Sequence, residues 1–189
     1  LITDRGGWVI RMGHPGMTPL PKMERVVDYA NSDFKSDWMD VFLWASCRFM
    51  IGTGSGPVHV PPTFGVPVLQ TNWPQIGMNP YFQKSLILPK LYYSNTEKRF
   101  FSYREMLESS LGWTVSSVFE GIDCTIVDNT PEEIEAAVGE MFEMESLPNQ
   151  FSQLSELQTE FNNLRSGYDG TGGATISETF AQKHSALFS

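Results

Sequence analysis

Residues Arg48–Asn72 read RFMIGTGSGPVHVPPTFGVPVLQTN, and they contain the pattern from which the fold class follows. The apolar run Phe49–Ile51 is typical of a buried strand, and Pro67–Gln70 is a second strand-like run. Between them lie a turn of alternating glycines and hydroxyl residues and a short apolar segment that ends at Gly65. A strand, a glycine-rich turn, a short helix and a strand form one βαβ unit, which predicts a parallel α/β sheet.

The glycine-rich turn is the first candidate site, and it consists of Gly52, Thr53, Gly54, Ser55 and Gly56. In open parallel sheets, ligands bind beyond the carboxyl ends of the strands, where this turn begins. Glycines allow backbone N–H groups to approach an anion, and the start of the next helix adds the positive end of its dipole. We therefore predict that Thr53, Gly54, Ser55 and Gly56 bind a phosphate or diphosphate. The alternative is a turn whose glycines serve only tight packing between strand and helix.

Two side chains near the start of the chain are candidate partners for that anion. Trp8–Met12 is a predicted strand, and a turn follows at Gly13–Gly16. If this strand runs parallel to Phe49–Ile51, Arg11 and His14 lie at the same sheet edge as the glycine-rich turn, where a guanidinium and an imidazole suit a diphosphate. The alternative is a surface ion pair for Arg11 and a turn cap for His14.

A second predicted strand, Arg25–Tyr29, ends in Asp28 and Tyr29, which we consider as contacts to a ribose or a base. The alternative is a carboxylate at a sheet end and a packed tyrosine. The segment that begins with Asn72 and Trp73 is polar and rich in proline and glycine, and it follows the strand Pro67–Gln70. We predict that it is a substrate-facing loop.

The helices complete an alternating pattern. Ser36 or Asp37 is expected to cap a helix over Trp38–Ser46, whose apolar residues fall on one face. Repeated alternation of strands and helices predicts a parallel sheet with right-handed crossovers. Farther along, Leu86–Tyr93 is strand-like with an irregularity at Pro89, and Thr125–Asp128 is a short strand.

Helix starts are marked clearly in the second half of the chain. Ser102 and Glu105 match a capping box, and Thr130 followed by Pro131 predicts a helix that continues to about Met144. Apolar residues at helical spacing predict another helix over Gln150–Arg165, and a last amphipathic helix is expected over Ala174–Phe188. We predict a Rossmann-like domain over residues 1–145 and a helical extension over residues 146–189 that packs back on the fold.

Composition limits the classes of partner. The chain has 189 residues and a net charge of −9, which argues against nucleic acid or an anionic membrane surface as the main partner. Its two cysteines lack metal-site spacing and are expected to be reduced. The sequence has no apolar run long enough to span a membrane and shows no signal peptide. We therefore predict a cytoplasmic protein. The chain begins at Leu1 and reaches a predicted strand within a few residues, which we interpret as the downstream part of something longer.

Residues in patterns typical of metal binding or catalysis are scarce. The three histidines lie far apart without a spaced carboxylate or cysteine partner, so we predict no metal site and no cofactor. No GxSxG motif, no P-loop lysine and no pair of catalytic carboxylates at a convincing spacing occurs. The sequence is therefore informative about binding and poor in catalytic groups.

The stretch from Ile51 to Val68 resembles the donor-side motif of glycosyltransferases with two Rossmann-like domains (the GT-B architecture), and distantly that of heptosyltransferases. More closely, the segments VDYA, KSDWMDVFL, TNW, VDNTPEEI and ISETF resemble a bacterial family of glycosyltransferases of unassigned specificity. These segments begin at Val27, Lys35, Thr71, Val127 and Ile176, and the likeness covers nearly the whole chain from Trp8 onward. Heptosyltransferase-like members often have Asp before the Ser-Gly-Pro, whereas this chain has Gly54, so a direct contact by that carboxylate is missing.

The resemblance implies the carboxyl-terminal, donor-binding half of a metal-independent glycosyltransferase that transfers a sugar from a nucleotide sugar to a hydroxyl acceptor. The diphosphate would lie against Thr53, Gly54, Ser55 and Gly56, with Arg11 and His14 as candidate stabilisers of the leaving group. The general base of such enzymes belongs to an amino-terminal domain that this chain lacks, so we expect the isolated chain to be inactive. Two alternatives remain open: an isomerase of the nucleotide-sugar 2-epimerase kind, and a non-catalytic nucleotide-binding or structural module.

Overall fold

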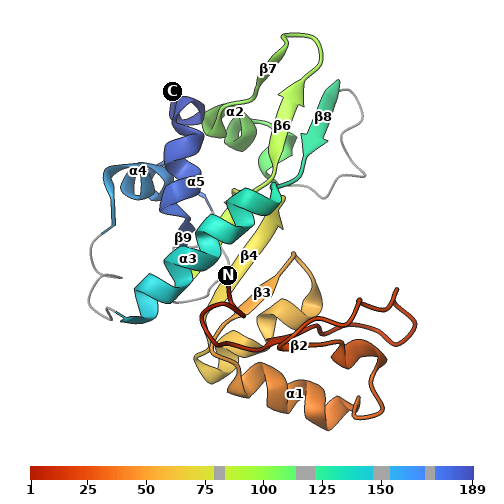
Figure 1. Ribbon diagram of the computed structural model, residues 1–189. Helices are drawn as coiled ribbons and strands as arrows, with labels where there is room; N and C mark the ends of the chain where they lie inside the picture. The colour runs from red at the N-terminus through yellow and green to blue at the C-terminus, as the bar shows by residue number, and fades with distance from the viewer. Residues whose placement is uncertain (79–83, 114–121, 147–153, 169–172) are drawn as a thin grey trace. The chain divides into compact units, whose positions relative to one another are not determined.

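The computed structural model describes residues 1–78, 84–113, 122–146, 154–168 and 173–189 (Figure 1). Contacts within the chain divide it into two compact units, Leu1–Cys47 and Arg48–Ser189, which we call the first and the second unit. The division says nothing about the predicted boundary at residue 145, which stays a prediction.

The first unit is a two-stranded parallel sheet followed by one helix. Strand β1 (Val9–Ile10) pairs with β2 (Val26–Val27), which confirms both predicted strands in shorter form. A 3-10 turn, η1 (Tyr29–Asn31), leads to helix α1 (Asp37–Ser46). Helix α1 begins as expected, because the Ser36 hydroxyl accepts a hydrogen bond from the Met39 N–H at 3.2 Å.

The apolar face of α1 is largely exposed. Trp38, Val41 and Phe42 keep 70%, 43% and 48% of their surface accessible, and the rings of Trp38 and Phe42 stack on each other at 5.4 Å. The spacing of these residues therefore predicts the helix correctly, although the side chains do not form a core.

The second unit is built on a four-stranded sheet with the order β3-β4-β5-β9. Its strands are β3 (Met50–Gly52), β4 (Val68–Trp73), β5 (Ser85–Pro89) and β9 (Ala174–Ile176), and every pair is parallel. Strands β4 and β5 are almost fully buried, as expected for central strands that are covered on both faces. The prediction of a parallel α/β sheet is confirmed for these four strands. It is wrong for the first two predicted strands, because β1 and β2 form a separate two-stranded sheet and do not pair with β3.

The crossover from β3 to β4 consists of two short 3-10 helices, η2 (Gly56–His59) and η3 (Pro61–Phe64). Each has proline among its first residues, where the missing N–H costs nothing. Gly65 ends η3 in the left-handed region, at φ 77°, which favours glycine. The expected single short helix is thus two tight turns, which carry a weaker dipole than a longer helix does.

A smaller antiparallel sheet, which the sequence did not predict, has the order β7-β6-β8. It consists of β6 (Leu91–Ser94), β7 (Arg99–Phe100) and β8 (Cys124–Val127). The predicted strand Leu86–Tyr93 is divided at Pro89 and Lys90 because its two halves belong to different sheets. Pro89 ends the first half, since it has no N–H for further pairing.

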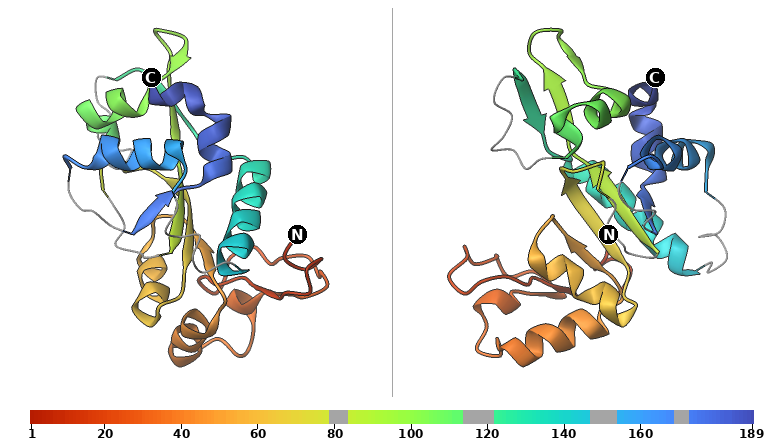
Figure 2. Two further views of the ribbon diagram at one scale, coloured as in Figure 1. Left: turned by 90° about the vertical axis from the view of Figure 1, so that its left-hand side faces the viewer. Right: turned by 180° about the vertical axis from the view of Figure 1, so that it is seen from behind.

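Helices cover both faces of the parallel sheet (Figure 2, left). Helices α2 (Tyr103–Glu108), with the turn η4 (Ser110–Gly112), and α4 (Glu156–Arg165) lie on one side, and α3 (Pro131–Ser146) lies on the other. The capping box predicted at Ser102 is present, and Thr130, where only a helix start was predicted, forms a second capping box with Glu133. Part of the predicted helix Gln150–Arg165 lies outside the described residues, and α4 confirms the rest.

The end of the chain corrects one prediction. Residues 174–176 form the edge strand β9, and only then do α5 (Glu178–Lys183) and the turn η7 (Ser185–Phe188) follow. Helical spacing was misleading here, because a three-residue strand is too short to show a period of two. Ser177 caps α5, whose first amides also donate to the Glu140 carboxylate of α3.

Candidate functional site

The glycine-rich turn follows β3 at the carboxyl end of the parallel sheet. Thr53, Gly54, Ser55 and Gly56 are all exposed, and Gly52 is half-buried in the strand. The Ser55 N–H donates to the Thr53 carbonyl at 2.7 Å, which tightens the turn. Among the described residues, the hydroxyls of Thr53 and Ser55 and the N–H groups of Gly54 and Gly56 have no hydrogen-bond partner. Donors of this kind at an exposed strand end suit an anion.

The fold does not require glycine at two positions of this turn. Gly54 and Gly56 have φ angles outside the left-handed region that favours glycine. A Cβ atom at Gly56 would meet nothing within 4 Å, and at Gly54 it would lie at an ordinary 3.6 Å from the Trp73 ring. Gly52 is different, because a Cβ atom there would come within 3.3 Å of Met50 and Val58. Tight packing therefore explains Gly52 but neither Gly54 nor Gly56.

The side chain of Trp73 lies against the glycine-rich turn. Only 6% of its surface is exposed, its Nε1–H donates to the Gln75 carbonyl at 2.7 Å, and its ring lies beside Gly54. The residue predicted to face substrate is thus almost entirely covered.

Asn72 is fixed by a reciprocal pair of hydrogen bonds. Its N–H donates to the Asn129 side-chain oxygen, and the Asn129 N–H donates to the Asn72 side-chain oxygen at 2.7 Å. The Asn129 amide also donates to the Pro89 carbonyl at 2.8 Å, so the ends of β4 and β5 and the start of α3 are joined. Asn72 adopts φ 52°, which asparagine tolerates better than most residues. The segment VDNTPEE predicts the helix start but gives no sign of this contact.

In the first unit, Arg11 and Asp28 form an ion pair of 2.7 Å. The Arg11 guanidinium also donates to the Thr18 carbonyl, and the Asp28 carboxylate accepts from the Asn31 side chain and the Leu20 N–H. The hydrogen bond from Asn31, the Leu20 N–H and the charge of Arg11 together hold the pKa of Asp28 below its ordinary value. These contacts fasten the loop after β1 to the end of β2.

The other two predicted residues of this unit have different surroundings. Tyr29 is buried, and its hydroxyl pairs with both the N–H and the carbonyl of Ser36. Burial raises the pKa of Tyr29. His14 is exposed, with its Nδ1 2.5 Å from the Pro15 carbonyl. Because Arg11, His14, Asp28 and Tyr29 belong to the first unit, their approach to the glycine-rich turn stays a prediction.

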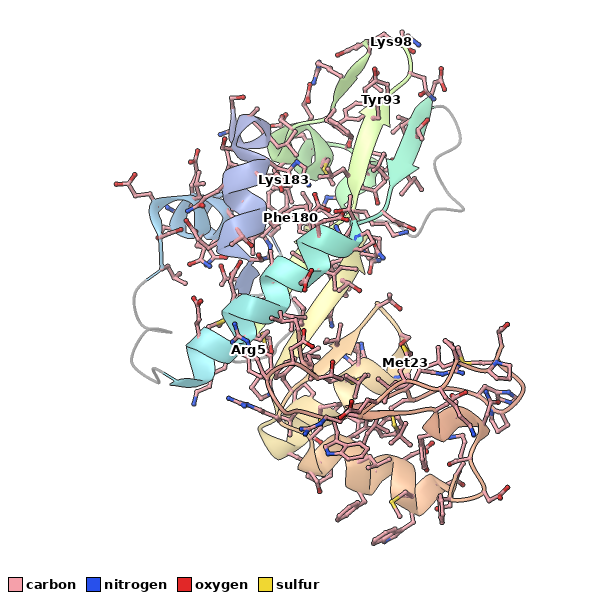
Figure 3. All side chains as sticks on the ribbon, viewed as in Figure 1. Arg5, Met23, Tyr93, Lys98, Phe180 and Lys183 are labelled. Atoms are coloured by element: carbon pink, nitrogen blue, oxygen red, sulfur yellow. The ribbon has the colours of Figure 1, made fainter. Side chains whose placement is uncertain are left out.

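A second group of charged residues, which the sequence did not single out, joins α3 to α5. Glu133 Oε1 accepts from Lys183 at 2.8 Å and lies 2.7 Å from His184 Nε2, and its Oε2 accepts from the Thr130 N–H at 2.8 Å. Lys183 and Phe180, labelled on α5 in Figure 3, line a shallow cavity of about 100 Å³ beside α3. Burial raises the pKa of Glu133, but the hydrogen bonds from Lys183, His184 and Thr130 outweigh it and leave the pKa below its ordinary value.

Neither the comparisons with known proteins nor the grouping of potential metal ligands assigns a function to the chain. No protein-family model matches the chain, and no curated protein and no solved structure is similar enough to indicate a relationship. Among the described residues, no three His, Cys, Asp or Glu side chains are grouped so as to hold a metal ion. The part of the chain that the structure describes also has no helix long and apolar enough to cross a membrane.

Proposed function

We propose that this chain is a nucleotide-sugar-binding domain, the donor half of a GT-B glycosyltransferase, and that the glycine-rich turn binds the diphosphate of the donor. The observation that carries the proposal is the pair Gly54 and Gly56, whose missing side chains neither backbone angles nor packing explain. Close approach of a ligand to the backbone is the remaining physical reason for glycine at such positions.

The position of the turn supports the same proposal. It lies at the carboxyl end of β3, beside the carboxyl end of β4, in a sheet whose strands are all parallel. Ligands of open parallel sheets bind at that edge. The exposed N–H groups of Gly54 and Gly56 and the hydroxyls of Thr53 and Ser55 are donors, and a diphosphate offers only acceptors.

In glycosyl transfer, these donors would act on the leaving group. As the bond between the sugar and the diphosphate breaks, negative charge develops on the departing phosphate oxygen. Backbone N–H groups that are already oriented stabilise such a charge without reorganisation. The acceptor hydroxyl and the group that removes its proton would belong to the other half of the enzyme.

Titration calorimetry of the chain with UDP, GDP, ADP and CMP tests the proposal, and Gly56→Val is the diagnostic variant. We expect one nucleotide to bind, and we expect Gly56→Val to weaken that binding about tenfold or more, because the new side chain occupies the open space above the turn. The fold should tolerate the change for the same reason, which circular dichroism verifies. Gly139→Ala on α3 is the matched control, since a Cβ atom there also meets nothing within 4 Å. Equal affinity of Gly56→Val and the parent chain would exclude the turn as the site.

A non-catalytic nucleotide-binding module is the second candidate, and one observation favours it. The Arg11 guanidinium, predicted to stabilise the leaving group, is paired with the Asp28 carboxylate. Nucleotide binding without sugar transfer or epimerisation by the full-length protein would support this candidate over the enzyme.

A further inference from the structure

The small antiparallel sheet is inserted at the edge of the parallel sheet where the glycine-rich turn lies. Between β5 and α3, the chain leaves the carboxyl end of the parallel sheet as β6 and returns to it as β8 (Figure 1). Leu91, the first residue of β6, is opposite Val127, the last residue of β8. Connections between a strand and the next helix are mostly short, and segments at this edge commonly carry binding residues. The base of the small sheet is therefore a candidate part of the proposed donor site.

Two side chains of opposite charge lie at that base. Lys90 precedes β6 and Asp128 follows β8, and the Lys90 ammonium is 2.7 Å from the Asp128 carboxylate. The side chains are 26% and 65% exposed, so solvent reaches both. An ammonium has three donors and a carboxylate about four acceptor sites, so their mutual contact uses only part of them. The pair can therefore bind a ligand without first being separated.

The pair is close to the glycine-rich turn. The Lys90 N–H donates to the Trp73 carbonyl at 2.9 Å, and a Cβ atom at Gly54 would lie 3.6 Å from the Trp73 ring. Trp73 thus lies against both Lys90 and the turn. Only β4 separates the end of β3 from the end of β5, which is about 10 Å at the usual spacing of strands. A ring attached to a diphosphate in the turn can span that distance.

The chemistry of the pair indicates which part of the donor it contacts. The ammonium offers only donors and the carboxylate only acceptors, whereas each hydroxyl of a sugar both donates and accepts. Neighbouring hydroxyls can therefore bind Lys90 and Asp128 at the same time. A nucleobase would instead favour an aromatic surface on which to stack. On the basis of the proposed function, we propose that Lys90 and Asp128 bind the hydroxyls of the donor sugar and so distinguish a nucleotide sugar from the free nucleotide.

The test is titration calorimetry of the whole chain with matched ligands: UDP and UDP-glucose, GDP and GDP-mannose, ADP and ADP-glucose. We expect the parent chain to bind one nucleotide sugar more tightly than the matching nucleotide. Lys90→Met and Asp128→Asn should each weaken the binding of that nucleotide sugar about tenfold, because each removes a hydrogen bond to a charged group. Their affinity for the nucleotide should not change. Both variants should unfold at nearly the temperature of the parent chain, because an exposed ion pair contributes little to stability.

Two further variants serve as controls. Lys98→Met is the matched control, because Lys98 is exposed at the turn between β6 and β7, at the far end of the same small sheet (Figure 3). It should bind the nucleotide and the nucleotide sugar like the parent chain. Gly56→Val should weaken the binding of both ligands, because they share the diphosphate.

The outcomes separate this proposal from the proposed function. Nucleotide binding that Gly56→Val weakens, combined with equal affinities of Lys90→Met and the parent chain for every nucleotide sugar, would overturn the sugar contact alone. Equal weakening of the nucleotide and the nucleotide sugar in Lys90→Met would also overturn it, because the pair would then contact the nucleotide itself. If the parent chain binds no nucleotide and no nucleotide sugar, the proposed function fails and the sugar contact fails with it.

Discussion

Replacing Glu133 by Gln should loosen the contact between α3 and α5 in a way that depends on pH. The substitution keeps the shape of the side chain and leaves one oxygen for the Thr130 N–H. It removes the charge that Lys183 and His184 share at 2.8 and 2.7 Å. Lys183 is half-exposed, so its ion pair contributes at most about 1 kcal/mol. The contact to His184, whose side chain is 16% exposed, is worth about 1.5 kcal/mol, and the expected loss is about 2 kcal/mol in total.

The sign of the pH dependence follows from the carboxylate. The pKa of Glu133 in the folded chain is below its ordinary value of 4.5, so its contribution to the free energy of unfolding is fully present above about pH 4.5. That contribution is lost as the pH falls through the lowered pKa and the carboxylate becomes protonated. Gln cannot be protonated in this range, so the difference between the two proteins should be large at neutral pH and should shrink in acid.

Urea unfolding at neutral pH and near pH 3.5 measures the loss in the free energy of unfolding and its dependence on pH. Hydrogen exchange of the α5 amides assigns that loss to the second unit. Exchange of the α5 amides should accelerate in the Gln variant at neutral pH. Glu135→Gln is the matched control, because Glu135 is exposed on the same helix, and it should change stability by less than about 0.5 kcal/mol. A difference between the parent chain and Glu133→Gln that is the same at both pH values would refute the assigned role of the charge.

Two further substitutions test the backbone around the sheet. Asn129→Ala should lower the free energy of unfolding by about 2–4 kcal/mol, because it leaves the Asn72 N–H and the Pro89 carbonyl without partners. Urea unfolding measures this loss, and a value under about 1 kcal/mol would mean that water replaces the side chain. Gly65→Ala should cost about 1 kcal/mol or more, because the position has φ 77°, and the unfolding temperature should fall by about 2–4 °C. An unchanged unfolding temperature would contradict the requirement for a left-handed residue there.

Local signals in the sequence were sufficient for the helix starts and for the parallel sheet. Ser36, Ser102 and Thr130 each cap the helix that follows, because a cap depends on residues three positions apart. The run from Met50 to Trp73 likewise gives two adjacent parallel strands, since its pattern lies within one short crossover.

Contacts between distant segments could not be predicted in the same way. Strand β9 pairs with β5 across some ninety positions, and its three residues are too few for a pattern. The pair Asn72 and Asn129 is separated by 57 positions, and asparagine occurs in many turns without such a partner. Arg165 is buried at the end of α4, where a basic residue is expected for electrostatic reasons, so its burial has no signature in the sequence.

The ion pair of Arg11 and Asp28 limits how the proposed donor site can work. A guanidinium that already has a carboxylate at 2.7 Å adds little net positive charge, and the chain as a whole carries −9. A diphosphate that relied on Arg11 would have to displace Asp28, which Asn31 and Leu20 also hold by hydrogen bonds. Asp28→Asn separates the two possibilities, because it frees the charge of Arg11 but leaves the glycine-rich turn intact. Tighter nucleotide binding in that variant would assign the diphosphate to Arg11, whereas unchanged binding would assign it to the backbone amides of the turn.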